Sequence, residues 1–418
     1  MLETLRSAWR IKELRQRITF TLLMLVVFRL GSHVPVPGVD PAQIANFFKA
    51  SNLFGLFNVF AGGALENYTI FAMGVFPYIN SSIIVQLLGV VIPKFEEWAK
   101  EGPEGQRKMQ QVVRYGTVVL ALVQATGMTL GLFRGAVLNP GTFTYLTIIV
   151  SLVAGTAFLM WLGELITEKG IGNGISVIIF AGIVSQFGPG VLQIYNLLRL
   201  GQLNIFVLLL IILIMLALIV GIIALEEGQR RIPVQYAKRV VGRRMYGGQS
   251  THIPFKVNQA GVIPVIFAST LLMFPSTIAG FIDHPVAKWI SRVFAPGTVV
   301  HTILFVLFIL FFAYFYTSIQ FDPYKIATDM KKYGGFIPGL RPGRPTAEFL
   351  GRVSSRLTLA GALALSLIAV SPVILQAIFK VNIIFGGTGM IIVVGVVLET
   401  MRQIESYLLM RNYQGFMK

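Results

Sequence analysis

Apolar stretches separated by polar segments recur ten times along the 418-residue chain. A helix needs about 20 mostly apolar residues to cross a bilayer. We expect membrane-spanning helices at residues 18–36, 71–92, 112–133, 144–165, 173–187, 203–224, 260–281, 299–320, 355–378 and 389–409. The fifth stretch is the shortest of the ten. The pattern predicts an all-α polytopic membrane protein.

The positive charges are distributed unevenly among the polar segments. With ten crossings, seven of the 35 Lys and Arg residues fall on one face: Arg29, Lys49, Arg134, Arg199, Lys288, Arg292 and Lys380. Short loops rich in Lys and Arg remain in the cytoplasm. The opposite face, which carries the remaining 28, is therefore predicted to be cytoplasmic, and both termini lie on it.

The amino-acid composition is unlike that of soluble domains and excludes several kinds of catalytic and metal site. The chain is 55% hydrophobic and 13% charged, whereas about a quarter of the residues in soluble domains are charged. It has no cysteine, which excludes a disulfide, a thiolate nucleophile and a cysteine metal site. Its four histidines share no helical face, and no nucleotide-binding or zinc-protease pattern occurs. We expect no cofactor, no metal and no enzymatic activity.

The order of the spans suggests two related halves. A division into residues 1–187 and 188–418 gives five crossings each, and an odd number forces the second half to enter from the opposite side. The halves would then be an inverted pair, as in many transport proteins. The first connection of each half is unusually long, at residues 31–70 and 225–259.

Residues 52–67 are apolar and aromatic but too short and too rich in glycine to span a bilayer. Such backbone is tolerated at membrane depth only where protein or water satisfies its polar groups. An interfacial segment and a re-entrant element fit the sequence equally well. The span that follows carries Asn80, Ser81, Ser82 and Gln86, for which hydrogen bonds between helices are favoured over a conducting role.

Two basic loops, residues 225–259 and 321–354, project from the predicted cytoplasmic face. Residues 230–236 alternate as a strand does, which predicts a hairpin in the first loop. The charges of these loops could serve only to keep the loops in the cytoplasm. The length of the loops, however, favours a role in docking a partner. The net charge of +17 favours contact with anionic lipids, or with an RNA-containing partner bound through its phosphates.

Two other functional classes fit ten spans less well. A secondary transporter for small solutes needs ionisable groups near the bilayer midplane, and the span interiors carry almost none. A membrane scaffold without a pathway does not explain the glycine-rich apolar stretch before a polar span. A passive pathway, or one driven by an external motor, fits best.

Separated motifs, kept in order and in their loop contexts, resemble those of the SecY family, the channel subunits of bacterial protein translocases. The resemblance covers the chain from its N-terminal basic segment to the tenth span. The motifs are Phe60-Ala-Gly-Gly-Ala-Leu65, Pro77-Tyr-Ile79, Gly170-Ile-Gly-Asn-Gly-Ile-Ser176, Gly228-Gln-Arg-Arg231, Gln249-Ser-Thr-His252, Ala260-Gly-Val-Ile-Pro264 and Pro338-Gly-Leu-Arg-Pro-Gly343.

The resemblance implies a protein-conducting channel with two inverted five-helix halves around an hourglass pore. The channel would move unfolded secretory polypeptides across the membrane and release membrane segments sideways into lipid, driven by an external motor or ribosome. Residues 53–67 would be the plug of the resting channel, with Phe57, Phe60, Gly62, Gly63 and Leu65 as its marked positions. The pore ring would consist of Val75, Ile79, Ile175, Ile179, Ile266 and Ile392.

The resemblance also assigns the gate, the docking sites and the partners. The lateral gate would use Asn80, Ser81, Ser82, Gln86, Asn258, Ser269 and Thr270. Docking of the motor or ribosome would use Arg243, Arg244, Arg341 and Arg344. The expected partners are SecE as an obligate subunit, SecG, the SecA ATPase, the ribosome through its rRNA, the translocated polypeptide and anionic lipids. The expected location is the bacterial cell membrane, with a thylakoid membrane as the less favoured alternative.

Overall fold

The structure is a computed structural model that describes residues 7–44, 55–201, 203–236, 239–241, 244–246, 250–280, 284–379 and 387–415. Contacts group the chain into two compact units, which are described separately. The first unit comprises Met1–Ile205, Ser269–Thr302 and Val396–Lys418. The second comprises Phe206–Ala268 and Ile303–Gly395.

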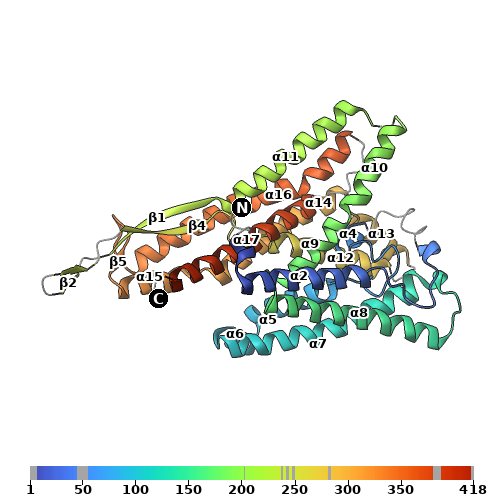
Figure 1. Ribbon diagram of the computed structural model, residues 1–418, viewed down its shortest axis with the longest axis horizontal. Coiled ribbons are helices and arrows are strands. Elements are labelled where there is room, and N and C mark those ends of the chain that lie inside the picture. Colours follow the sequence, from blue (N-terminus) through green and yellow to red (C-terminus); the bar gives the residue numbers. More distant parts are fainter. Residues whose placement is uncertain are drawn as a thin grey trace. The chain divides into compact units, whose positions relative to one another are not determined.

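Most of the described chain is helical (Figure 1). The helices before the first basic loop are α2 (Lys12–Gly31), α4 (Gly55–Phe60), α5 (Phe76–Val91), α6 (Pro93–Lys100), α7 (Pro103–Gly127), the π-helical turn η2 (Met128–Leu132), the short turn η3 (Arg134–Ala136), α8 (Thr142–Lys169), α9 (Gly174–Ser185), α10 (Phe187–Arg199) and α11 (Ile205–Glu227).

The remaining helices follow the first basic loop and include the longest of the chain. They are α12 (Ile263–Gly280), α13 (Pro285–Val293), α14 (Val299–Gln320), α15 (Pro323–Lys332), α16 (Arg344–Phe379) and α17 (Gly387–Gly415). The strands are β1 (Gln229–Tyr236), β2 (Arg239–Val241), β3 (Arg244–Tyr246), β4 (Ser250–Lys256) and β5 (Gly335–Phe336).

The described part of the chain contains seven helical segments long and apolar enough to cross a membrane. An eighth is added if α5 and α6, which meet at a bend of 100°, form one span. The structure thus confirms a helical polytopic membrane protein, whereas the count of ten spans stays a prediction. The remaining predicted crossings correspond to α2 and α12, of which α2 begins in a basic, polar segment and only Ile263–Pro275 of α12 counts as a short apolar helix.

Several helix ends differ from the hydropathy boundaries. Helix α16 begins at Arg344, well before residue 355, because its first turns are helical but polar. The fifth apolar segment continues through α10 to Arg199 rather than ending at residue 187. Its Pro189 lies in the first turn of α10, where a missing backbone N–H costs no helical hydrogen bond. Helix α5 begins at Phe76, and residues 71–75 form turns.

Small residues let the helices of the first unit approach closely. A side chain at Gly155 of α8 would overlap the carbonyl oxygen of Ile70, and one at Gly174 of α9 would overlap that of Gly163 in α8. Helices α7 and α8 run side by side (Figure 1). Close backbone approach through glycine is typical of helix packing in membranes.

The glycines at residues 170–174 of the sequence predict a tight turn after the fourth span, and the structure has this turn. Helix α8 ends at Lys169, and α9 begins at Gly174 with the side chain of Asn173 accepting a hydrogen bond from the backbone N–H of Ser176. The turn is also held from outside, since the backbone N–H of Ile171 donates to Thr21 Oγ1 of α2 at 3.0 Å. Sequence alone indicated the turn but not this contact.

In the second unit, the first basic loop forms the predicted hairpin. Strand β1 leaves the end of α11 and pairs antiparallel with β4, so that Ile232 lies opposite Ile253 (Figure 1). Strand β5 of the second basic loop pairs with the far end of β1, which gives the sheet order β4-β1-β5. The two basic loops therefore form one folded element.

This sheet packs on helices through a small core of its own. Its members are Ile232, Val234, Phe255, Met330, Ile337, Leu350 and Val353, all nearly inaccessible to solvent. Phe255 also meets Phe321 edge to face, with ring centroids 5.0 Å apart. The alternation in β1, which buries Ile232 and Val234 and exposes their neighbours, is what makes the packing one-sided.

We predict that Phe255→Ala will destabilise this element, because removing a buried aromatic ring leaves a cavity that costs about 3 to 5 kcal/mol. The measurement is the rate of limited proteolysis at the basic loops of the purified protein. Thr251→Ala, at an exposed position of the same strand, is the control and should change the free energy of local unfolding by less than about 0.5 kcal/mol. Equal rates for the two variants would contradict the shared core.

Candidate functional site

The segment predicted to be the plug is a compact, buried turn. After α4, the chain turns repeatedly from Ala61 to the start of α5. The side chain of Asn58 closes the turn, since its Nδ2 donates to Glu66 Oε2 at 3.0 Å and its Oδ1 accepts from the backbone N–H of Glu66 at 3.1 Å. Phe60 and Leu65 are buried, as is Gly62, and Gly63 is half-buried. The predicted plug residue Phe57 lies in α4, and its side chain is outside the description.

The plug segment packs on the C-terminal part of α9. A side chain at Gly182 would meet the carbonyl oxygen of Phe60 at 2.6 Å, so only glycine allows this approach. Ser185 Oγ lies 3.4 Å from the carbonyl oxygen of Gly62, and Arg29 Nη1 of α2 donates to the same oxygen at 2.9 Å. The segment is therefore packed inside the first unit. Its position relative to the membrane, interfacial or re-entrant, stays a prediction.

The end of the plug segment is fixed by a buried tyrosine. Tyr68 has φ 43°, a left-handed conformation that is unusual for a residue other than glycine. Its ring meets Phe133 edge to face at 5.2 Å between centroids, and its hydroxyl lies 3.4 Å from Thr129 Oγ1. Burial raises the pKa of Tyr68 to about 12, so its hydroxyl stays protonated at physiological pH. Strain at this position is offset by the packing around it.

Four of the six predicted ring residues lie in the first unit. Val75 precedes α5, and its carbonyl accepts the backbone N–H of Ile79 one turn later. Ile175 and Ile179 lie one turn apart in α9, and Ile175 packs toward Gly163 of α8. Of these four, only Ile175 is not fully buried.

The other two ring residues, Ile266 and Ile392, belong to the second unit and are buried in it. Their helices lie side by side there, because a side chain at Gly395 of α17 would overlap Val262, just before α12 begins. In the second unit, the two ring residues thus lie on neighbouring elements. In the first unit, Val75 and Ile79 lie at the start of α5, and Ile175 and Ile179 lie in α9. The assembly of all six into one ring stays a prediction.

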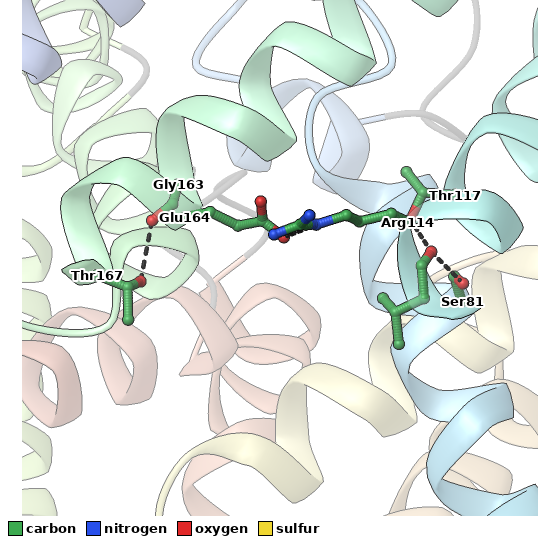
Figure 2. A network of polar contacts seen from close by, with 7 residues as sticks. Ser81, Arg114, Thr117, Gly163, Glu164 and Thr167 are labelled. Carbon is green, nitrogen blue, oxygen red and sulfur yellow. Dashed lines mark hydrogen bonds and ion pairs between the residues drawn. The ribbon is translucent and has the colours of Figure 1, made fainter. Parts of the chain in front are cut away.

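The predicted gate residues of α5 make hydrogen bonds within the bundle. Ser81 Oγ donates to the carbonyl oxygen of Val113 in α7 at 2.8 Å, and Thr117 donates to the same oxygen at 2.7 Å (Figure 2). Gln86 Nε2 donates to Ser82 Oγ at 3.0 Å, and Asn80 is buried. The bond of Ser81 confirms, for that residue, the interpretation that these polar groups join helices.

A charged pair lies next to this contact. Arg114 Nε of α7 and Glu164 Oε1 of α8 are 2.7 Å apart, with 48% and 26% of their side chains exposed (Figure 2). Beside it, Thr167 Oγ1 donates to the carbonyl oxygen of Gly163 at 2.9 Å. Helix α7 is therefore tied to α5 by a hydrogen bond and to α8 by an ion pair. Sequence analysis did not identify this pair, because the two residues are far apart in the chain.

The remaining gate residues lie at or near α12. Asn258 is buried in the second unit, where its Nδ2 donates to Glu226 Oε1 at 2.6 Å and to the carbonyl oxygen of Gly261 at 2.9 Å. Ser269 and Thr270 are buried within α12. Asn258 therefore fixes the connection between β4 and α12.

Three of the four predicted docking residues, Arg244, Arg341 and Arg344, lie in the described parts of the basic loops. Arg341 is exposed, and its carbonyl accepts a hydrogen bond from Thr346 Oγ1 at 2.8 Å. Arg344, at the start of α16, pairs with Glu348 at 3.0 Å and has 82% of its side chain exposed. Arg244 is in β3, but its side chain is outside the description, and Arg243 lies wholly outside the described residues.

Comparison with known proteins assigns the family. Residues 69–401 match the SecY family model. The protein translocase subunit SecY of Halalkalibacterium halodurans is 51% identical, with all of both chains covered. That of Escherichia coli K12 is 45% identical, with 97% of this chain and 94% of the relative covered.

Solved structures show the same fold. The structure described as that of a protein-conducting channel has a TM-score of 0.66 at 19% identity and covers 94% of this chain and 92% of its own. Sec61 in the canine ribosome-channel complex has a TM-score of 0.63 at 18% identity, with the same coverage. The chain therefore belongs to the SecY family of protein translocase subunits and has the fold of a protein-conducting channel.

Proposed function

We propose that unfolded polypeptides cross the membrane through this chain, past the six ring residues, and that hydrophobic segments leave it sideways into lipid. The observation that carries the proposal is the position of the plug segment. It packs against α9, which holds Ile175 and Ile179, and it continues directly into α5, which holds Ile79. One buried turn thus adjoins two elements that carry ring residues. Branched aliphatic side chains at a constriction exclude water and ions by dewetting.

Plug displacement would open this path. One similar solved structure is of a SecY protein whose plug domain stabilises the closed state of the translocation channel and maintains a membrane seal. In this chain, residues 55–67 would act in the same way. Opening toward lipid would involve the polar residues of α5 and α12.

External partners would supply the energy. Two similar structures are described as a Sec61 ribosome-channel complex and an Ssh1 complex bound to the yeast 80S ribosome. Here the two basic loops would dock the ribosome or the SecA ATPase through Arg243, Arg244, Arg341 and Arg344. SecE and SecG would complete the translocase in a bacterial cell membrane, with both termini cytoplasmic. The relatives at 45–51% identity are bacterial, which supports this location.

Disulfide capture in vesicles tests the path. Because the chain has no cysteine, single cysteines at Ile79, Ile179 or Ile392 can each be paired with one cysteine in a stalled secretory precursor. We expect crosslinks from all three positions. A cysteine at Leu213 of α11, which is 63% exposed on a helix of high hydropathy, is the control and should give none. Crosslinks from Leu213 alone would rule out the proposed path.

We predict that Ile79→Gly combined with Ile179→Gly will make reconstituted vesicles permeable to small ions. Removing two branched side chains widens the constriction, so that water can fill it. Ion efflux from dye-loaded vesicles measures the effect. Ile212→Gly, at an exposed position of α11, carries a helix penalty of about 1 kcal/mol, like each of the two substitutions taken singly, and should leave the vesicles tight.

We predict that Arg341→Glu will weaken ribosome binding without changing ion permeability, because it places a negative charge against rRNA phosphate. The slope of log K against log salt should fall in magnitude by about 1 for one lost phosphate contact. Co-sedimentation over a range of salt concentrations measures this slope. Arg199→Glu, at the exposed end of α10, is the control, and an equal effect there would contradict docking at the basic loops.

A further inference from the structure

Among the described residues, the carbonyl group of Gly62 is the polar attachment of the plug segment to α2 and α9. Arg29 Nη1, in the last turn of α2, donates to the carbonyl oxygen of Gly62 at 2.9 Å. Ser185 Oγ, at the end of α9, lies 3.4 Å from the same oxygen but only 2.7 Å from the carbonyl of Gly182 in its own helix. A hydroxyl has one proton to donate, so Arg29 is the principal donor to the plug.

The backbone of the plug segment is shaped to present this carbonyl. Gly62 has φ +67° and Gly63 has φ +83°, conformations that residues with a side chain rarely adopt. Opposite them, Gly182 leaves a notch into which the backbone fits, with its Cα 3.1 Å from where a side chain on Gly62 would begin. The guanidinium and the notch thus hold the same residue from two helices.

The hydrogen bond from Arg29 to the Gly62 carbonyl is of a kind that can hold the plug segment and still break when the channel opens. Hydrogen bonds with an ionised donor are roughly twice as strong as neutral ones. Because the Arg29 side chain is exposed in the chain alone, another acceptor can replace the carbonyl when the plug leaves. The hydrogen bond to Gly62 therefore favours the closed state, and the exchange of acceptors keeps that state reversible.

We propose that Arg29 and the notch at Gly182 form a latch that sets the resting closure of the channel. The proposal rests on the proposed function of residues 55–67 as a plug. Arg29 is a positioning residue: it holds the plug through the Gly62 carbonyl and does not line the path. Loss of the latch favours the open state and leaves the path itself unchanged.

The test compares two substitutions with matched controls, in the full translocase reconstituted into vesicles. Arg29→Gln removes the charged donor, and Gly182→Ala fills the notch. Arg134→Gln removes a cation from the same predicted outer face, and Gly188→Ala adds a side chain where nothing lies within 4 Å. We expect Arg29→Gln and Gly182→Ala to raise resting ion efflux about tenfold, Arg29→Lys to give an intermediate value, and both controls to match the parent.

A second readout separates a latch from a merely structural role. Easier opening should let Arg29→Gln export a precursor whose signal sequence is defective, whereas misfolding would reduce export of every precursor. If Arg29→Gln does not accumulate, Gly182→Ala against Gly188→Ala decides the question.

The outcomes of these tests also distinguish a failure of the latch proposal from a failure of the channel proposal. Parental efflux and unchanged precursor selectivity in both Arg29→Gln and Gly182→Ala would overturn the latch, and crosslinks at Ile79 would then still support the channel. Absence of crosslinks at Ile79 in the parent would instead overturn the proposed path.

Discussion

The structure depends on the requirement that backbone polar groups find partners inside the protein wherever water is excluded. Continuous helices meet this requirement by themselves, which explains why most of the described chain is helical. The informative places are those where the backbone is not helical. In the first unit, two of these are the turns from residue 61 to residue 75 and the turn after α8, and both are held by side chains or backbone of other segments.

In the plug segment, the hydrogen bonds that hold the irregular backbone come mainly from the segment itself. Its own side chains close the turn through Asn58 and Glu66, and Thr69 donates to the carbonyl of Ala64. Only a few bonds reach the surrounding helices, among them that of Arg29. Among the described residues, the segment is therefore held by more hydrogen bonds within itself than to the surrounding helices. If the segment acts as the proposed plug, this combination would let it move as one body, because few of the described hydrogen bonds to the helices would break while its own turn stays intact.

Features with a local signal in the sequence were predictable, whereas features that depend on distant contacts were not. The alternation at residues 230–236 and the glycines at 170–174 indicated the hairpin and the turn, and both are present. Strand β5 has two residues and no periodicity, so its pairing with β1 could not be read from the chain. Ring isoleucines have the same hydropathy as core isoleucines, and only family resemblance singles them out. The contacts of Arg29 and Arg114 join residues 33 and 50 positions away.

The shared core of the two basic loops links segments that lie on either side of α12 and α14 in the sequence. Val234 and Phe255 from one loop pack with Ile337 and Leu350 from the other, so neither loop has a complete interior alone. Substitutions in one must be compatible with the shape of the other, and the two loops are expected to be inherited as a pair. A chimera that receives a single loop from a relative would combine mismatched halves of one interior, so an intact fold of these loops is transferable only when both are exchanged together.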